Sequence, residues 1–276
     1  MTWEDIQDRK YPPIGRCIYC GSDGGPDRLR DEHIIPYSLG GRAVLKEASC
    51  RACEQITSYI DGYLSRHIFY QLRSHVGAPS RRKLPSTLSA NVSVGDQQMT
   101  RDFPAPDQPF ALMLPIWDLP GIMRGDQPRP DFPVRGVRAY NFMPSTLRET
   151  LGLRDDAPDP LVHIASGEIN NITFARSIAK IAHCGAVAKY GLTGFRSLVL
   201  PDIILGRYAC PPYFVGSDPD PPPPPYPRTV RHTIEIATAT ECGGLRLLVA
   251  SVRLFAHSGT AEHGMPIYRV VIGAPH

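Results

Sequence analysis

Two cysteine pairs of equal spacing frame one short motif: CIYC at residues 17–20, DEHIIPYSLGG at residues 31–41 and CRAC at residues 50–53. Each CxxC pair brings two thiolates onto one tight turn, and two facing turns supply the four soft ligands of a tetrahedral Zn²⁺ site. We therefore expect a structural zinc ion bound by Cys17, Cys20, Cys50 and Cys53. A site with four protein ligands has no open position for water, so its expected role is to hold the fold.

The residues between and after the two pairs predict a strand, a turn and a helix. Residues 29–35 are expected to form a strand that Pro36 stops, and Gly40-Gly41 can adopt backbone angles that other residues resist. Residues 53–76 place apolar side chains, such as Ile56 and Ile60, at helical spacing. The predicted order is strand, turn, second strand and helix, with zinc joining the first knuckle to the start of the helix.

This arrangement resembles the HNH endonucleases over about residues 15–76: a CxxC pair, an acidic-His-Ile-x-Pro turn ending in SxGG, and a second CxxC pair that opens a helix. The resemblance implies a ββα-metal core that cuts nucleic acid, with DNA the expected substrate. It also implies that His33 is the general base and that Glu32 binds a catalytic divalent cation. A histidine is largely neutral near pH 7 and can accept a proton, and a carboxylate suits Mg²⁺ or Mn²⁺.

Two positions depart from the family pattern. Leu45 stands where the family has its middle asparagine, which braces the loop that carries the histidine. Glu54 follows the second knuckle, where the family usually has His or Asn. We expect Glu32 and Glu54 to hold the catalytic cation as a carboxylate pair, which favours Mg²⁺ or Mn²⁺ over a second zinc ion. Two alternatives stay open: a structural His33, and a Glu54 that only stabilises the first helical turn.

The small net charge of +3 does not by itself indicate nucleic-acid binding, but its distribution is uneven. Residues 1–83 hold 13 Lys/Arg and 10 Asp/Glu, whereas residues 84–276 hold 17 of each. Basic residues near the motif are candidate contacts for the phosphate backbone. They are Arg42, Arg51, Arg66, Arg73 and the cluster Arg81, Arg82 and Lys83. The alternative for the cluster is a solvated surface.

The sequence predicts a cytoplasmic protein without a membrane anchor, because no apolar run approaches the ~20 residues of a membrane helix and no leader-like segment is recognisable. In a reducing compartment, paired cysteines act as metal ligands more often than they form disulfides. The unpaired Cys184, Cys210 and Cys242 are expected to be buried or inert thiols.

The expected fold class is α+β, with a zinc-stapled nuclease domain at residues 1–83 and an uncharacterised domain at residues 84–276. Three features are predicted in the second domain. Residues 170–191 form a helix, residues 211–228 hold a stiff proline-rich loop, and the C-terminal strands form an antiparallel sheet. One face of the helix is apolar and is lined by Ile172, Ala175, Ile178, Ala179 and Ala182. Whether this domain docks DNA, binds a partner or forms a dimer is left open.

The function predicted from the sequence is therefore a metal-dependent HNH-type endonuclease that hydrolyses phosphodiester bonds. The alternative is a zinc-stapled module that binds nucleic acid or protein and whose HNH loop has lost catalytic activity. The departures at Leu45 and Glu54 motivate that alternative.

Overall fold

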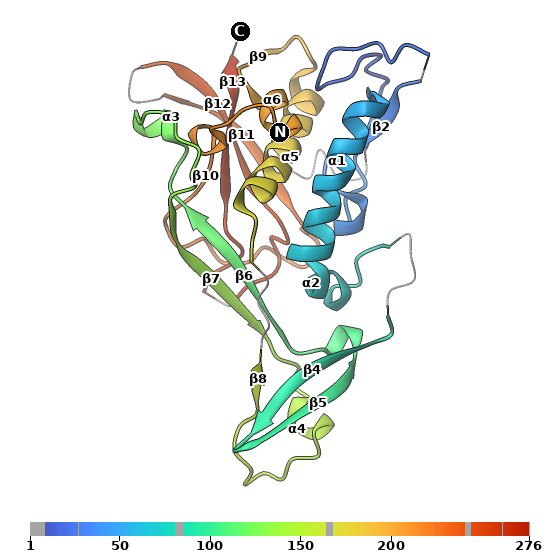
Figure 1. The fold of residues 1–276 in the computed structure, drawn as a ribbon, viewed down its shortest axis with the longest axis vertical. Helices are drawn as coiled ribbons and strands as arrows, with labels where there is room; N and C mark the ends of the chain where they lie inside the picture. Colours follow the sequence, from blue (N-terminus) through green and yellow to red (C-terminus); the bar gives the residue numbers. More distant parts are fainter. Residues whose placement is uncertain are drawn as a thin grey trace.

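The computed structural model describes residues 9–26, 28–80, 85–163, 168–240, 244–260 and 262–275. Helices and several separate sheets are mixed along the chain, which confirms the α+β class (Figure 1). The helices are α1 (Arg51–Tyr63), α2 (Tyr70–His75), α3 (Gly121–Arg124), α4 (Leu147–Thr150), α5 (Asn171–Tyr190) and α6 (Leu200–Leu205). The strands are β1 (Lys10–Tyr11), β2 (Arg30–His33), β3 (Val44–Ser49), β4 (Thr87–Val94), β5 (Gln97–Pro104), β6 (Phe110–Trp117), β7 (Val134–Phe142), β8 (Leu161–His163), β9 (Phe195–Ser197), β10 (Val215–Ser217), β11 (Thr233–Thr240), β12 (Arg246–Arg253) and β13 (Tyr268–Pro275).

The N-terminal part has the predicted order of strand, turn, strand and helix. Strands β1, β3 and β2 form one sheet, in which β3 is parallel to β1 and antiparallel to β2. The predicted single helix was wrong in one respect, because a π-helical turn at Leu64–Ile68 separates α1 from α2. There the Ser65 hydroxyl donates to the Asp61 carbonyl at 3.1 Å, a side-chain bond that competes with the regular backbone pattern.

Helix α5 is the centre of the molecule and lies between α1 and the C-terminal sheet (Figure 1). Asn170 caps its start by accepting from the Thr173 N–H at 2.9 Å. Because neighbours cover it on several sides, 14 of its 20 residues are buried. Four residues of the predicted apolar face, Ala175, Ile178, Ala179 and Ala182, are buried, whereas Ile172 in the first turn is 46% exposed.

The predicted C-terminal antiparallel sheet is confirmed. It has the order β10-β13-β12-β11, and β9 also pairs with β13. All of these strand pairs are antiparallel. One continuous apolar core joins this sheet, α5 and the N-terminal segment. The proposed boundary at residue 83 stays a prediction, but the parts on either side of it pack as neighbours.

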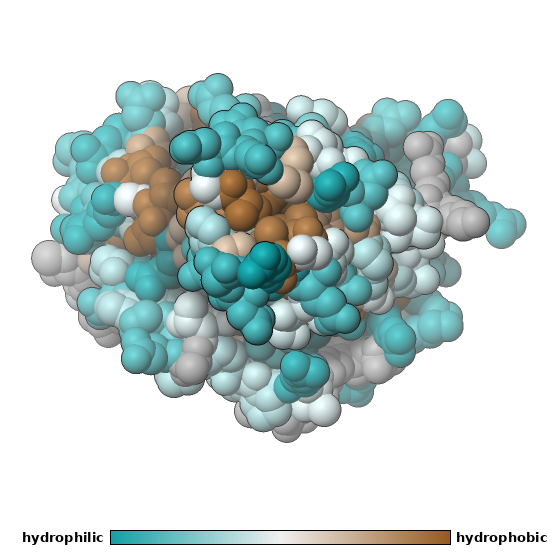
Figure 2. Space-filling model, turned by 90° about the horizontal axis from the view of Figure 1, so that it is seen from below, coloured by the Kyte–Doolittle hydropathy of each residue, from teal (hydrophilic) through white to brown (hydrophobic). Residues whose placement is uncertain are grey.

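Between α2 and α5 the chain forms a small lobe of its own. Strands β5, β4 and β8 make a sheet with a separate apolar cluster, and the hairpin β6–β7 leads back to the main body (Figure 1). Seen from the lobe end, apolar surface lies between hydrophilic residues (Figure 2). None of the helices in the described residues is long and apolar enough to cross a membrane.

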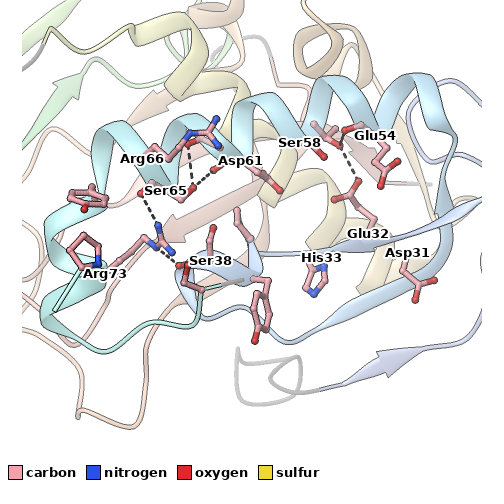
Figure 3. Close-up of a pocket in the computed structure, with 17 residues that line it drawn as sticks. Asp31, Glu32, His33, Ser38, Glu54, Ser58, Asp61, Ser65, Arg66 and Arg73 are labelled. Atoms are coloured by element: carbon pink, nitrogen blue, oxygen red, sulfur yellow. Dashed lines mark hydrogen bonds between the residues drawn. The ribbon is translucent and has the colours of Figure 1, made fainter. Parts of the chain in front are cut away.

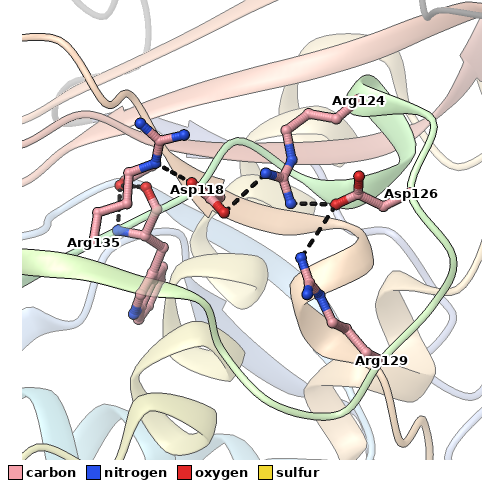
Figure 4. A network of polar contacts seen from close by, with 7 residues as sticks. Asp118, Arg124, Asp126, Arg129 and Arg135 are labelled. Atoms are coloured by element: carbon pink, nitrogen blue, oxygen red, sulfur yellow. Dashed lines mark hydrogen bonds and ion pairs between the residues drawn. The ribbon is translucent and has the colours of Figure 1, made fainter.

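A network of charged side chains stabilises the long connection between β6 and β7. Asp118 pairs with Arg124 at 2.8 Å and with Arg135, and Asp126 pairs with Arg124 and Arg129 (Figure 4). The Asp118 side chain is 12% exposed, and its hydrogen bonds and charge contacts to arginine outweigh burial and lower its pKa. These arginines therefore have carboxylate partners within the fold.

Candidate active site and zinc knuckle

The four predicted zinc ligands converge. The sulfur atoms of Cys17, Cys20, Cys50 and Cys53 all lie within 4.8 Å of one another. The Cys20 and Cys50 sulfurs are 3.6 Å apart, close to the ~3.8 Å that a tetrahedral site with Zn–S bonds of ~2.3 Å requires. The cluster fits a structural zinc ion in both ligand type and spacing.

Backbone geometry explains why the first knuckle can present two thiols. The Gly21 N–H donates to the Cys17 carbonyl at 2.9 Å, and Gly21 has a φ of 76°, a left-handed value that suits glycine. The Ile18 N–H donates to the Ala48 carbonyl on β3 at 2.8 Å, which ties the knuckle to the sheet. Burial raises the pKa of Cys17 and of Cys53, so a bound cation would have to stabilise their thiolates.

A bulge between β2 and β3 shapes the motif. Arg30 pairs with Ser49 but Glu32 pairs with Leu45, so β3 carries extra residues at this point. The bulge contains Glu47, whose φ of 49° is rare for a residue with a side chain. Its N–H donates to Asp31 Oδ1 at 3.1 Å. Asp31 thus stabilises the bulge that directs Glu32 and His33.

The motif and helix α1 border one open cleft of about 550 Å³. Because neighbouring strand residues point to opposite faces, Glu32 turns toward α1 and His33 lies on the other side of the strand (Figure 3). His33 is half-buried, and its ring meets Tyr37 edge-on with centroids 5.9 Å apart. The cleft brings together the three predicted catalytic residues, His33, Glu32 and Glu54.

Glu32 is held by partners on two other elements. Its carboxylate lies 2.9 Å from Nζ of Lys180 on α5 and accepts a 3.3 Å hydrogen bond from the Thr57 hydroxyl on α1. Lys180 also pairs with Asp61 at 3.0 Å. Burial opposes the charge on Lys180, but the carboxylates of Asp61 and Glu32 outweigh it and raise the pKa of Lys180. Burial raises the pKa of Asp61 to about 6 against the opposing effect of Lys180.

Glu54 lies in the first turn of α1, directly after the second knuckle. Its carboxylate pairs with Arg30 Nε at 3.1 Å, and both side chains are partly exposed. Leu45 is fully buried opposite Glu32, so it packs in the core and offers no polar atom to the site.

The carboxylate donors suit a hard divalent cation. Glu32 and Glu54 border the cleft, and the buried Asp61 Oδ1 has no hydrogen-bond partner among the described residues. Oxygen donors of this type are the ligands that Mg²⁺ and Mn²⁺ prefer. A bound cation would neutralise charge that develops on a phosphate. Within the part of the chain that is described, the cysteine cluster is the only group of three or more His, Cys, Asp or Glu residues whose ligand atoms lie close enough together to hold a metal ion.

The predicted phosphate contacts lie in different places. Arg42 and Arg51 are exposed but do not line the cleft, whereas Arg66 does. Arg73 also reaches the cleft, yet it is 5% exposed and donates to the Ser65 carbonyl at 3.0 Å and to the Ser38 carbonyl. Its guanidinium group therefore stabilises the turn after His33 through the hydrogen bond to Ser38. Arg81, Arg82 and Lys83 lie outside the described residues.

Two residues of the C-terminal part reach the motif and were not predicted to do so. Lys180 contacts Glu32, and the buried His232 donates through Nε2 to the Leu39 carbonyl at 2.9 Å. The Phe255 N–H donates to His232 Nδ1 at 3.2 Å, which fixes the tautomer. A lysine inside the apolar pattern of a buried helix was a usable signal, because such a charge requires partners.

Comparison with known families agrees with the motif. The family model described as HNH endonuclease matches residues 17–69, which include both knuckles, His33 and all of α1. No curated protein and no solved structure matched the chain in the corresponding searches. Residues 17–69 of this chain thus carry an HNH endonuclease motif built on a four-cysteine site that fits zinc.

Proposed function

We propose that the protein is a metal-dependent endonuclease that hydrolyses phosphodiester bonds in DNA. The observation that carries the proposal is the meeting of His33, Glu32 and Glu54 around one cleft, next to a cysteine cluster that fits zinc. An open cleft beside a strand end can admit a nucleic-acid backbone, and Arg66 on its wall offers a positive charge to phosphate.

In this proposal the side chains have distinct tasks. His33 accepts the proton of the attacking water, because an imidazole that borders the cleft can act as a general base there. Glu32 and Glu54 hold the divalent cation, Mg²⁺ or Mn²⁺. The four cysteines hold zinc and fix the position of α1 relative to β2.

Plasmid nicking tests the proposal. Cleavage is expected with Mg²⁺ or Mn²⁺ and not without them, in protein whose zinc content is unchanged. His33→Ala is expected to lower the rate by ~10²–10⁴-fold, the usual cost of losing a general base. His67→Ala is the matched control, because His67 is exposed on the π-helical turn and does not line the cleft. Equal loss in both variants, or cleavage that survives in His33→Ala, contradicts the assignment.

A second candidate has one observation in its favour. Both predicted cation ligands already pair with a cationic side chain, Glu32 with Lys180 and Glu54 with Arg30. In a zinc-stapled module that binds nucleic acid without cutting it, neither carboxylate needs to be free to bind a metal ion. Gel-shift binding without cleavage under every divalent cation would select this candidate.

A further inference from the structure

Lys180 is a charged residue at the centre of the molecule. It lies in the middle of α5, and its side chain is 0% exposed. A buried ammonium group is costly unless it is paired and hydrogen-bonded. Its partners therefore indicate why the charge is there.

All three partners belong to the nuclease segment. Nζ lies 2.9 Å from Glu32 Oε1, 3.0 Å from Asp61 Oδ2 and 2.6 Å from the backbone carbonyl oxygen of His33. An ammonium group has three N–H donors, and here it has three acceptors. Two of the three contacts are to the adjacent residues at the end of β2 that the proposed mechanism uses.

Lys180 makes these contacts from behind the cleft. Glu32, His33 and Asp61 line the cleft, and Lys180 does not. A substrate phosphate in the cleft would meet the carboxylates and the imidazole, and Lys180 would stay covered. The residue is thus placed to orient other groups and not to touch the substrate.

Within the described part of the N-terminal segment, Thr57 on α1 also contacts Glu32. Leu45, opposite Glu32 in the strand register, has no polar side-chain atom. Within the segment, the Thr57 hydroxyl donates to Glu32 at 3.3 Å, a longer contact than that of Lys180. The HNH resemblance implies an asparagine at the position of Leu45 on β3, where it would brace the loop that carries the histidine. In this protein Lys180 on α5 makes a polar contact to the end of β2.

The same side of α5 makes further polar contacts with the nuclease segment. The Ser177 hydroxyl donates to the Ile60 carbonyl on α1 at 3.0 Å, and Cys184 meets the Tyr19 hydroxyl at 3.4 Å. Ser177, Lys180 and Cys184 are spaced i, i+3 and i+7, so they form one stripe of the helix. The stripe sets the position of Lys180 relative to α1 and to the first knuckle.

We propose that Lys180 is a positioning residue of the nuclease site: from α5 it fixes the Glu32 carboxylate and the His33 backbone. The catalytic motif within residues 17–69 is therefore completed by a helix that follows it by about a hundred residues in the sequence. The role in cleavage rests on the proposed function, whereas the positioning of β2 can be measured without it.

The first arm of the test is kinetic. Lys180→Met removes the ammonium group and keeps an unbranched side chain. We expect kcat for plasmid nicking to fall by about 10²-fold, the cost of a small misplacement of catalytic groups, with KM for DNA and zinc content within about twofold of wild type. Lys189→Met is the matched control: Lys189 is on the same helix and donates to the Ile236 carbonyl at 3.0 Å, away from the cleft. It should leave kcat unchanged.

The second arm is hydrogen–deuterium exchange, which needs no activity. In Lys180→Met, peptides covering residues 30–40 should exchange at least about tenfold faster, because the restraint on the end of β2 is lost. Lys189→Met should leave these peptides at the wild-type rate. If the wild type cleaves no DNA, the proposed function fails, and this arm still decides whether Lys180 positions β2.

Removing the ammonium leaves the carboxylates of Glu32 and Asp61 without their shared cation, which can prevent folding. Lys180→Gln provides the second variant, because its neutral amide still donates hydrogen bonds. It should give rates and exchange between those of wild type and Lys180→Met. A kcat within threefold of wild type in a folded Lys180 variant overturns the proposal. Exchange that rises equally throughout the chain also overturns it, since that indicates a general structural role.

Discussion

His183 of α5 donates through Nε2 to the Ile18 carbonyl oxygen, 2.9 Å away, between the first two cysteines of the zinc knuckle. Ile18 has only an acceptor there, so Nε2 carries the proton. Burial lowers the pKa of His183 to about 4, which keeps the imidazole neutral. The knuckle is therefore attached to the central helix as well as to its own sheet.

Zinc removal is expected to destabilise the C-terminal part together with the nuclease segment. Purified protein should contain about one zinc per chain, and chelation or Cys50→Ser should lower the melting temperature in a single transition that includes the core around α5. Structural zinc contributes ~10 kcal/mol or more in small zinc peptides. Elemental analysis and calorimetry provide the measurements. A zinc-free protein with wild-type melting would contradict the assignment of the cysteine cluster.

The proline-rich loop is expected to be part of the core packing. Arg253 is 2% exposed and donates to the Pro224 carbonyl at 3.1 Å and to the Met265 carbonyl at 3.0 Å. Arg253→Leu would leave the buried Met265 carbonyl without its donor, at ~1–3 kcal/mol, and would also remove the bond to the exposed Pro224. Urea unfolding should show a loss of at least about 2 kcal/mol. Arg246→Leu, exposed on the same strand, should change stability by less than about 0.5 kcal/mol. Equal effects would show that the loop is not held by Arg253.

The parts of the fold that depend on local sequence were predictable. The CxxC turns, the cap at Asn170 and the alternating C-terminal strands each carry their signal within a few residues. The contacts of Lys180 and His232 were not predictable in this way. Lys180 is 147 residues from His33, and His232 is 193 residues from Leu39. A lysine within the apolar pattern of residues 170–191 indicates that a buried charge needs acceptors, but only the packing of α5 on β2 identifies them.

Glu54 can be tested as a metal ligand separately from its ion pair. Glu54→Ala is expected to reduce cleavage by at least about 10–100-fold, as losses around metal sites do. Glu54→His should retain cleavage and shift the metal preference toward Ni²⁺ or Co²⁺. Arg30→Gln removes the partly exposed partner and should alter the rate by less than about fivefold, since such pairs contribute ~1 kcal/mol or less. Full activity in Glu54→Ala would show that this carboxylate only stabilises the first turn of α1.

Phosphate contacts should appear in the salt dependence of DNA binding. Arg66→Ala is expected to weaken binding on every sequence and to reduce the slope of log affinity against log salt by ~0.9 on duplex DNA. Neutralising Arg81, Arg82 and Lys83 together should reduce it by ~0.9 for each contact that is lost. Arg207→Ala is the control, because Arg207 is exposed after α6 and does not line the cleft. An unchanged slope would identify the substituted residues as solvated surface.

His232 should make stability depend on pH. Burial lowers its pKa to about 3, and the charges of Arg231 and His257 add to the effect. In the unfolded chain the group titrates near 6.5, so below that pH the unfolded state binds a proton that the native state rejects. The stability contributed by neutral His232 is complete above pH 6.5 and is lost progressively as the pH falls toward 3. Between pH 7.5 and 5.5 this group should lower the free energy of unfolding by about 1.4 kcal/mol.

Substitution isolates that contribution. His232→Gln can still donate to the Leu39 carbonyl but does not titrate, so its stability should fall less steeply with decreasing pH than that of wild type. Urea unfolding at pH 7.5, 6.5 and 5.5, with zinc content measured at each pH, compares the slopes. His67→Gln, an exposed histidine on the π-helical turn, should keep the wild-type slope. If His232→Gln keeps that slope as well, the native state accommodates a protonated His232, and its bond to Leu39 does not depend on a neutral ring.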